Sequence, residues 1–132
     1  MTDYTHKNLK DDVDNSAEKF GLAPDLEARF ARSALDLQGG GFSYQRLAPN
    51  FRGPFGHRHT TQEEVYVIVA GSGRVKLEDE IRDLHEWDVL RVEPTVARGF
   101  EAGPAGLELI AIGFGEGGEA ETLPDFWPAD NA

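Results

Sequence analysis

The chain contains no cysteine, and Met1 is the only methionine among its 132 residues. The absence of cysteine excludes disulfides, zinc–thiolate sites and a cysteine nucleophile. Basic residues are few: 13 Lys and Arg stand against 24 Asp and Glu, which gives a net charge of −11. Nucleic acids and anionic membranes attract basic surfaces, so we expect this protein to bind neither.

Long hydrophobic runs are also missing. No segment approaches the roughly 20 apolar residues of a membrane helix, and residues 1–14 lack the apolar stretch of a signal peptide. The sequence contains no P-loop, no dinucleotide-binding glycine fingerprint and no G-x-S-x-G nucleophile motif. We therefore expect a cytoplasmic protein, and the chain length fits one domain.

Short apolar segments alternate with glycine and proline from Phe42 onward, which is typical of an antiparallel all-β domain. We predict breaks between strands at Gly71-Ser72-Gly73, at Glu78-Asp79-Glu80 and at Gly103-Pro104. Because the first of these lies between two predicted strands, a hairpin turn is favoured there over a phosphate-binding loop. The predicted strands are 42–48, 64–69, 74–77, 81–84, 88–92, 98–101 and 107–114.

The two ends of the chain differ from this β region. Residues 1–20 are polar and predict an irregular arm. Residues 24–37 fit a helix, with Leu26, Phe30 and Ala34 in one stripe, or a strand, with Leu26, Ala28 and Phe30 on one face; we favour a turn followed by a strand. The predicted parts are an N-terminal arm with a first strand (1–38), a barrel (39–114) and an acidic, aromatic tail (115–132). The tail either packs on the barrel or covers its mouth or a neighbouring subunit.

The segment around His57 and His59 carries the strongest signal for a site. The two histidines are separated by one residue, so their side chains share a face if the segment is extended. Glu64 follows His59 by an odd number of positions, so residues 60–62 must bend for its carboxylate to join them. Two imidazoles and one carboxylate form a candidate site for a divalent metal such as Fe, Mn, Ni or Zn. Tyr66 shares the face of Glu64 and is either a core residue or a ligand contact.

This segment resembles the first motif of the cupin family. His57, His59, Glu64 and Gly71 reproduce the motif's spacing, although Phe51 stands where the motif begins with glycine. The second cupin motif is degenerate, with substitutions at Trp87, Glu93, Thr95, Arg98 and Ala102. The resemblance implies a double-stranded β-helix, or jelly-roll barrel, with a small-molecule site inside the barrel mouth, and a homodimer.

Arg98 stands where the resemblance implies a third histidine ligand. A guanidinium has no acceptor atom and stays protonated, so it cannot bind a metal ion. Two arrangements remain open. In one, Arg98 turns away or sits behind Glu64, and His57, His59 and Glu64 hold a metal; in the other, Arg98 pairs with Glu64 and no metal is needed. The second would suit an anionic or polar ligand contacted by Arg98. The first would also suit a metal-dependent oxygenase or isomerase.

Three valines, Val65, Val67 and Val69, alternate with Glu64, Tyr66 and Ile68 along the predicted strand. Alternation places the valines on the outer face of the barrel. An apolar outer face needs a cover, which adds a physical reason to expect a homodimer.

Overall fold

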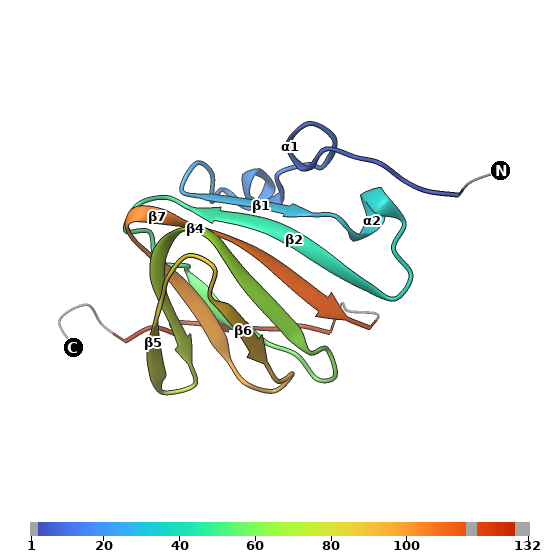
Figure 1. Cartoon of the computed structure of the whole chain (residues 1–132). Coiled ribbons are helices and arrows are strands. Elements are labelled where there is room, and N and C mark those ends of the chain that lie inside the picture. Colours follow the sequence, from blue (N-terminus) through green and yellow to red (C-terminus); the bar gives the residue numbers. More distant parts are fainter. Residues whose placement is uncertain (1–2, 116–118, 129–132) are drawn as a thin grey trace.

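The computed structural model describes residues 3–115 and 119–128 and shows a curled, eight-stranded antiparallel sheet (Figure 1). The strands are β1 (Leu26–Phe30), β2 (Gly40–Leu47), β3 (Phe55–Arg58), β4 (Glu64–Leu77), β5 (Glu80–Leu84), β6 (Val89–Val92), β7 (Arg98–Phe114) and β8 (Glu121–Pro124). Helical structure is confined to α1 (Leu9–Asp12), η1 (Ser16–Phe20) and α2 (Arg32–Leu35) within the described residues. The predicted all-β jelly roll is confirmed.

Strands β4 and β7 form the central pair of the barrel because they pair with each other along most of their length. The end of β7 also pairs with β2, which pairs with β1, whereas the start of β7 pairs with β3, which pairs with β8. On the other side, β4 pairs with β6 near its start and with β5 near its end. The sheet thus folds into two facing layers that share β4 and β7 (Figure 1).

The core lies between these two layers. Alternation along β4 places Glu64, Tyr66 and Ile68 inside and leaves Val65 and Val67 partly exposed on the outer face, as the sequence predicts. Tyr66 packs against Phe100 of β7, with ring centroids 4.8 Å apart. The other large, fully buried side chains are Ile68, Val75, Arg98, Leu107 and Leu109.

Two predicted breaks are wrong. Gly71-Ser72-Gly73 does not form a hairpin turn, and Gly103-Pro104 does not end a strand, because β4 and β7 both run through these points. The pairing skips Ser72 on β4 and residues 103–106 on β7, so Pro104 needs no ladder hydrogen bond. The glycines instead allow the backbones of β4 and β7 to lie close together. A Cβ on Gly71 would lie 2.0 Å from the Gly106 carbonyl oxygen.

Both ends of the chain contribute to the sheet. Residues 26–30 form a strand, so the favoured prediction is right for the first part of segment 24–37, whereas Arg32–Leu35 form α2. Leu26, Ala28 and Phe30 share a face through their pairing with Leu47, Gln45 and Ser43. In the tail, β8 adds to the edge of β3. Among the described residues, no helix has the length and apolar character needed to cross a membrane.

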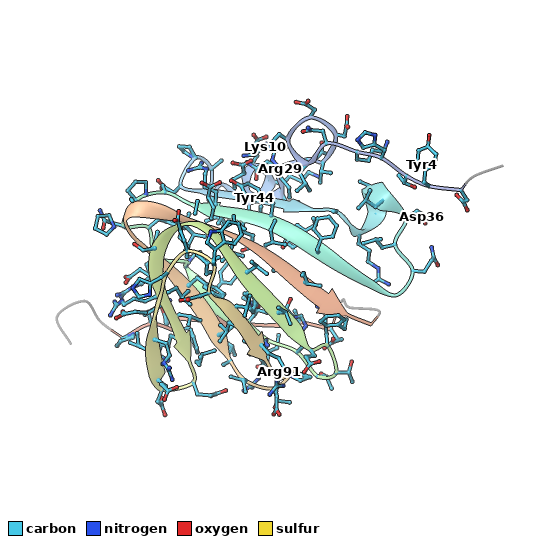
Figure 2. The ribbon with its side chains drawn as sticks, viewed as in Figure 1. Tyr4, Lys10, Arg29, Asp36, Tyr44 and Arg91 are labelled. Atoms are coloured by element: carbon cyan, nitrogen blue, oxygen red, sulfur yellow. The ribbon has the colours of Figure 1, made fainter. Side chains whose placement is uncertain are left out.

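The N-terminal arm wraps the edge of β1. On the outer face, Lys10 and Arg29 pair with the buried carboxylate of Glu27 at 2.9 and 2.6 Å, and Arg46 joins them at 3.2 Å. Figure 2 shows Lys10, Arg29 and Tyr44 gathered on this side of the sheet. Asn15 then accepts a hydrogen bond from the Ala28 backbone N–H at the strand edge, which places η1 near the barrel interior.

Candidate metal centre

His57, His59 and Glu64 come together at one end of the barrel. His57 lies on β3, His59 follows it, and Glu64 begins β4 after a bend at residues 60–61. One ligand atom from each residue lies within 4.8 Å of the others. Nε2 of His57 is 3.2 Å from Glu64 Oε1, and Nε2 of His59 is 3.3 Å from the same oxygen. The bend predicted between the histidines and the glutamate is therefore present.

His59 is the most deeply buried histidine of the group, with only 7% of its side chain exposed. Neither of its ring nitrogens has a hydrogen-bond partner among the described residues. Buried polar atoms are normally paired, and Nε2 faces the Glu64 carboxylate oxygen at 3.3 Å, so this nitrogen is the candidate for a bound ion. Burial lowers the pKa of His59 and keeps the ring neutral, which is the form that binds metals. The backbone N–H of His59 donates to the Pro94 carbonyl at 2.7 Å and fixes the segment.

The Glu64 carboxylate is the hub of the group. Its Oε1 accepts a hydrogen bond from the Tyr66 hydroxyl at 2.5 Å, and its Oε2 accepts one from the Gln62 amide at 3.4 Å. Burial alone would raise the pKa of Glu64, but hydrogen bonds from His57 and Tyr66 outweigh it and lower the pKa to about 2. Burial and the Glu64 charge raise the pKa of Tyr66 well above its ordinary value. The site therefore holds a carboxylate beside a neutral phenol that donates.

These residues fit a divalent transition metal. They supply two imidazole nitrogens and one carboxylate oxygen, a donor set that suits Fe, Mn, Ni and Zn. The rings of His57 and His59 stand at 89° with centroids 5.1 Å apart, so they do not stack and both Nε2 atoms reach the Glu64 oxygen. The buried Nε2 of His59, which has no hydrogen-bond partner among the described residues, agrees with this fit.

Arg98 is fully buried and turns toward the backbone of the preceding loop. Its Nη2 donates to the Glu93 carbonyl at 3.1 Å and its Nη1 lies 3.5 Å from the Pro94 carbonyl oxygen. No hydrogen bond or ion pair joins it to Glu64 within the described part of the chain. Of the two arrangements open from the sequence, the pairing of Arg98 with Glu64 is not seen among the described residues, and a metal held by His57, His59 and Glu64 remains a prediction. Contact between Arg98 and a ligand remains a prediction.

Two residues of the site were missed in the sequence. Gln62 lies two positions before Glu64, so the alternation that placed Tyr66 could also have placed Gln62. Glu119 gave no such signal, because it lies in an acidic, glycine-rich segment far along the chain. Its carboxylate accepts hydrogen bonds from the backbone N–H groups of Thr60 and Gln62 at 2.5 and 3.1 Å and lies 3.6 Å from His59 Nδ1.

A cavity of about 450 Å³ opens beside the three ligands. Its polar end is formed by His57, His59, Glu64 and Tyr66, so Tyr66 contacts the cavity as well as the core. The rest of its wall comes from η1 and the segment after it, from β1, α2, β2 and β3, from Gln62, from the end of β7, and from β8 with the residue before it. The predicted tail thus contributes to the cavity through Ala120 and Thr122. A space of this size suits a small organic molecule.

A scan against protein-family models finds no match, and neither does a search of curated proteins. Solved structures nevertheless share the architecture. A cupin protein from Bacteroides fragilis aligns with a TM-score of 0.71 and 24% identity, over 89% of this chain and 88% of that chain. A salicylate 1,2-dioxygenase from Pseudaminobacter salicylatoxidans aligns with a TM-score of 0.62 and 18% identity, over 74% of this chain and 30% of that chain.

A third structure, a predicted oxalate decarboxylase from Thermotoga maritima, aligns with a TM-score of 0.60 and 21% identity, over 69% of this chain and 81% of that chain. The matches share little sequence identity, so they establish the architecture and leave the chemistry open. They agree with the jelly-roll topology and with the resemblance seen around His57 and Glu64. This chain has the fold of the cupins.

Proposed function

We propose that this protein binds a divalent transition-metal ion through His57, His59 and Glu64 and holds a small ligand beside it in the cavity. The observation that carries the proposal is His59, whose buried nitrogens have no hydrogen-bond partner among the described residues while Nε2 faces the Glu64 carboxylate. A bound ion would act as a Lewis acid and would offer its remaining coordination positions to the ligand.

The protein's own residues prepare this centre. Tyr66 keeps its proton and donates a hydrogen bond to Glu64, so one carboxylate oxygen is held in place. Gln62 holds the other oxygen. With both oxygens fixed and the His59 segment tied to the Pro94 carbonyl, the three ligands keep their relative positions without the ion.

Metal analysis tests the proposal directly. Protein made without a histidine tag is incubated in turn with Fe²⁺, Mn²⁺, Ni²⁺ and Zn²⁺, desalted and measured for bound metal. We expect one ion per chain for at least one of these metals and loss of binding in His59→Ala. His85→Ala is the matched control, because His85 is exposed and lies outside the cavity. A wild-type metal content near zero with all four ions would refute the proposal.

Catalysis is the second candidate function. Three protein ligands leave coordination positions free, and structurally similar proteins include one called a dioxygenase and one called a decarboxylase. An oxygenase or isomerase acting at the same centre is therefore the alternative. Oxygen uptake by the Fe²⁺-loaded protein with salicylate as probe is the first assay. Uptake no greater than that of His59→Ala would count against an oxygenase acting on this class of compound.

The outer face of the barrel suggests a second copy as partner. Val65 and Val67 of β4 lie beside Ile110 and Ile112 of β7 and next to Val89 of β6, of which 71% is exposed. We propose that this apolar face forms a homodimer. Light scattering on wild type and Val89→Glu tests it: a wild-type monomer would contradict the proposal.

Location and other partners follow from composition. The absence of cysteine agrees with the cytoplasm, where disulfides are rare, and cell fractionation tests this. The net charge of −11 supports the expectation that nucleic acid and anionic membranes are not partners.

A further inference from the structure

The cavity beside the metal centre is strongly divided between a polar end and an apolar wall. Beyond the four polar-end residues, the wall is formed largely by side chains without hydrogen-bonding groups. They come from η1 and the segment that follows it, from β1 and from β3: Phe20, Leu22, Leu26, Ala28, Phe30 and Phe55. A ligand that reaches the metal centre therefore lies against hydrocarbon along the rest of its length.

Several of these wall residues are exposed in a way that the fold does not explain. Phe20 is 75% exposed, Phe30 is 57% exposed and Phe55 is 44% exposed, and all three line this one cavity. Large apolar side chains gathered around a single opening mark a binding site more often than a free surface. An apolar body in the cavity would cover them.

Two polar side chains farther along the wall, Gln45 and Arg32, already have partners within the chain, and the hydroxyls of Ser16 and Thr122 are further polar groups there. The Gln45 amide donates to Ser43 Oγ at 3.1 Å. Arg32, which lies against Gly41, donates to the Gly115 carbonyl at 2.7 Å. Hydroxyl groups on the body of a ligand would thus find few open partners and would lose their hydration, which opposes the binding of sugars and other polyols.

The charge at the polar end of the cavity determines which head group of a ligand can bind there. A divalent ion bound by one carboxylate and two neutral imidazoles leaves a net positive charge at the polar end. A single carboxylate on the ligand would neutralise it and supply oxygen donors to the ion. The surrounding protein is strongly acidic, with a net charge of −11, so compounds with several negative charges are disfavoured.

We propose that the ligand of this cavity is a small monocarboxylate with an apolar body, aromatic or branched aliphatic. The inference rests on the proposed metal site, which would bind the carboxylate, and it adds the class of the remaining part of the molecule. The carboxylate would lie beside His57 and His59, and the body would lie between the β1 face and Phe55.

Calorimetry on the Zn²⁺-loaded, full-length protein tests this with two matched probes. Cyclohexanecarboxylate and glucuronate each carry one carboxylate on a six-membered ring, but only glucuronate carries hydroxyl groups. We expect cyclohexanecarboxylate to bind at least about tenfold more tightly. Equal binding of the two probes, or tighter binding of glucuronate, would overturn the proposal.

A wall variant provides the second arm. Phe30→Ser removes an apolar ring that is more than half exposed, so the fold should tolerate it. We expect cyclohexanecarboxylate to bind about fivefold more weakly to this variant, while Zn²⁺ binding stays unchanged. Phe114→Ser is the control, because Phe114 is 50% exposed but lies outside the cavity, and both affinities should stay at the wild-type value. No effect of Phe30→Ser would contradict the assigned wall.

The outcomes separate this inference from the proposed function. If Zn²⁺ binds and the probes are not distinguished, only the ligand class is wrong. If Zn²⁺ does not bind, the metal site is wrong, and the probes are then compared on metal-free protein: a preference for the cyclohexyl ring supports the apolar wall, and its absence overturns it. Probe binding that weakens as the protein concentration rises would show that a second copy fills the cavity, which also overturns the proposal.

Discussion

Arg98 and His57 lie directly opposite each other on β7 and β3, so their side chains project from the same face of the sheet. The guanidinium is fully buried there. Burial is the largest cause that lowers the pKa of His59, and the charges of His57 and Arg98 lower this pKa further. A permanent cation thus lies in the interior near a group that is proposed to hold a second one.

Removing this charge should strengthen metal binding. Arg98→Met keeps much of the side-chain volume, and replacing a buried charge by an apolar group is often tolerated. We expect the affinity for Zn²⁺ to rise about fivefold, which corresponds to ~1 kcal/mol of relieved repulsion. Competition titration with a chelator measures it. Arg91→Met, which removes an exposed arginine paired with Glu63, should change nothing. Unchanged or weaker binding in Arg98→Met would mean that the buried charge does not act on the site.

Glu119 should act as a positioning residue for His59. Its carboxylate holds the bend between His59 and Glu64 and faces His59 Nδ1 at 3.6 Å, which favours a proton on Nδ1 and leaves Nε2 free for the metal. We expect Glu119→Gln to lower the affinity for Zn²⁺ about tenfold. Nitrogen NMR of the His59 ring should also show a loss of the Nδ1–H form, which a purely structural role would not produce.

The control for Glu119 is close in the sequence. Glu121→Gln removes a carboxylate that pairs with Arg58 on the exposed side of β3, away from the ligands. Zn²⁺ affinity and the His59 tautomer should both match the wild type. If the two glutamine variants behave alike, the assigned role of Glu119 is wrong.

The sequence predicted that His57, His59 and Glu64 form a group but did not predict the residues that hold it, for a physical reason. His57, His59, Glu64 and Tyr66 lie within one short segment, where strand alternation and motif spacing fix their faces. Glu119 reaches the same site from 59 positions beyond Thr60, and no local pattern records so distant a contact.

Arg98 and the glycines show the same limit. Two arrangements were open for Arg98, and the choice depends on the Glu93 and Pro94 carbonyls, whose positions only the folded loop defines. Gly71 and Gly73 predicted a turn because glycine is common in turns. In the structure they allow the backbones of β4 and β7 to lie close together. A glycine's role depends on its neighbour across the sheet, which a single sequence does not give.

Glu27 should make stability depend on pH. Burial acts to raise its pKa, but hydrogen bonds from Arg29, Lys10 and Arg46 lower the pKa to about 2. Since the unfolded value is about 4.3, the carboxylate stabilises the fold above that pH, and the contribution disappears as the pH falls toward 2. Glu27→Gln should reduce the free energy of unfolding at pH 7 by about 2 kcal/mol.

Urea unfolding at pH 7 and at pH 3 checks both parts of this prediction. The difference in the free energy of unfolding between wild type and Glu27→Gln should reach its full value at pH 7 and should be clearly smaller at pH 3. Glu80→Gln, at an exposed pair with Arg82, should resemble the wild type at both. A gap that is the same at both pH values would contradict the pKa assigned to Glu27.

Gly56 should tolerate no side chain, although it lies next to a proposed ligand. A Cβ there would lie 2.6 Å from the Phe126 ring and 2.9 Å from the Arg98 carbonyl oxygen. We expect Gly56→Ala to lower the free energy of unfolding by about 2 kcal/mol, because the tail and the β3–β7 pairing must both shift. Chemical denaturation measures it. Gly39→Ala, where no atom lies within 4 Å, should be close to neutral, and similar losses in both variants would contradict this account.

The continuity of β4 and β7 has a consequence for how the molecule opens. Each strand runs from one layer to the other through the irregular pairing at Ser72 and residues 103–106, so opening one layer should disturb the pairing of the other. Amide protons near the ligand end and near the β4–β5 end should therefore exchange through the same global event. Local fluctuation would be left to the arm and to β8, which both contribute residues to the cavity wall.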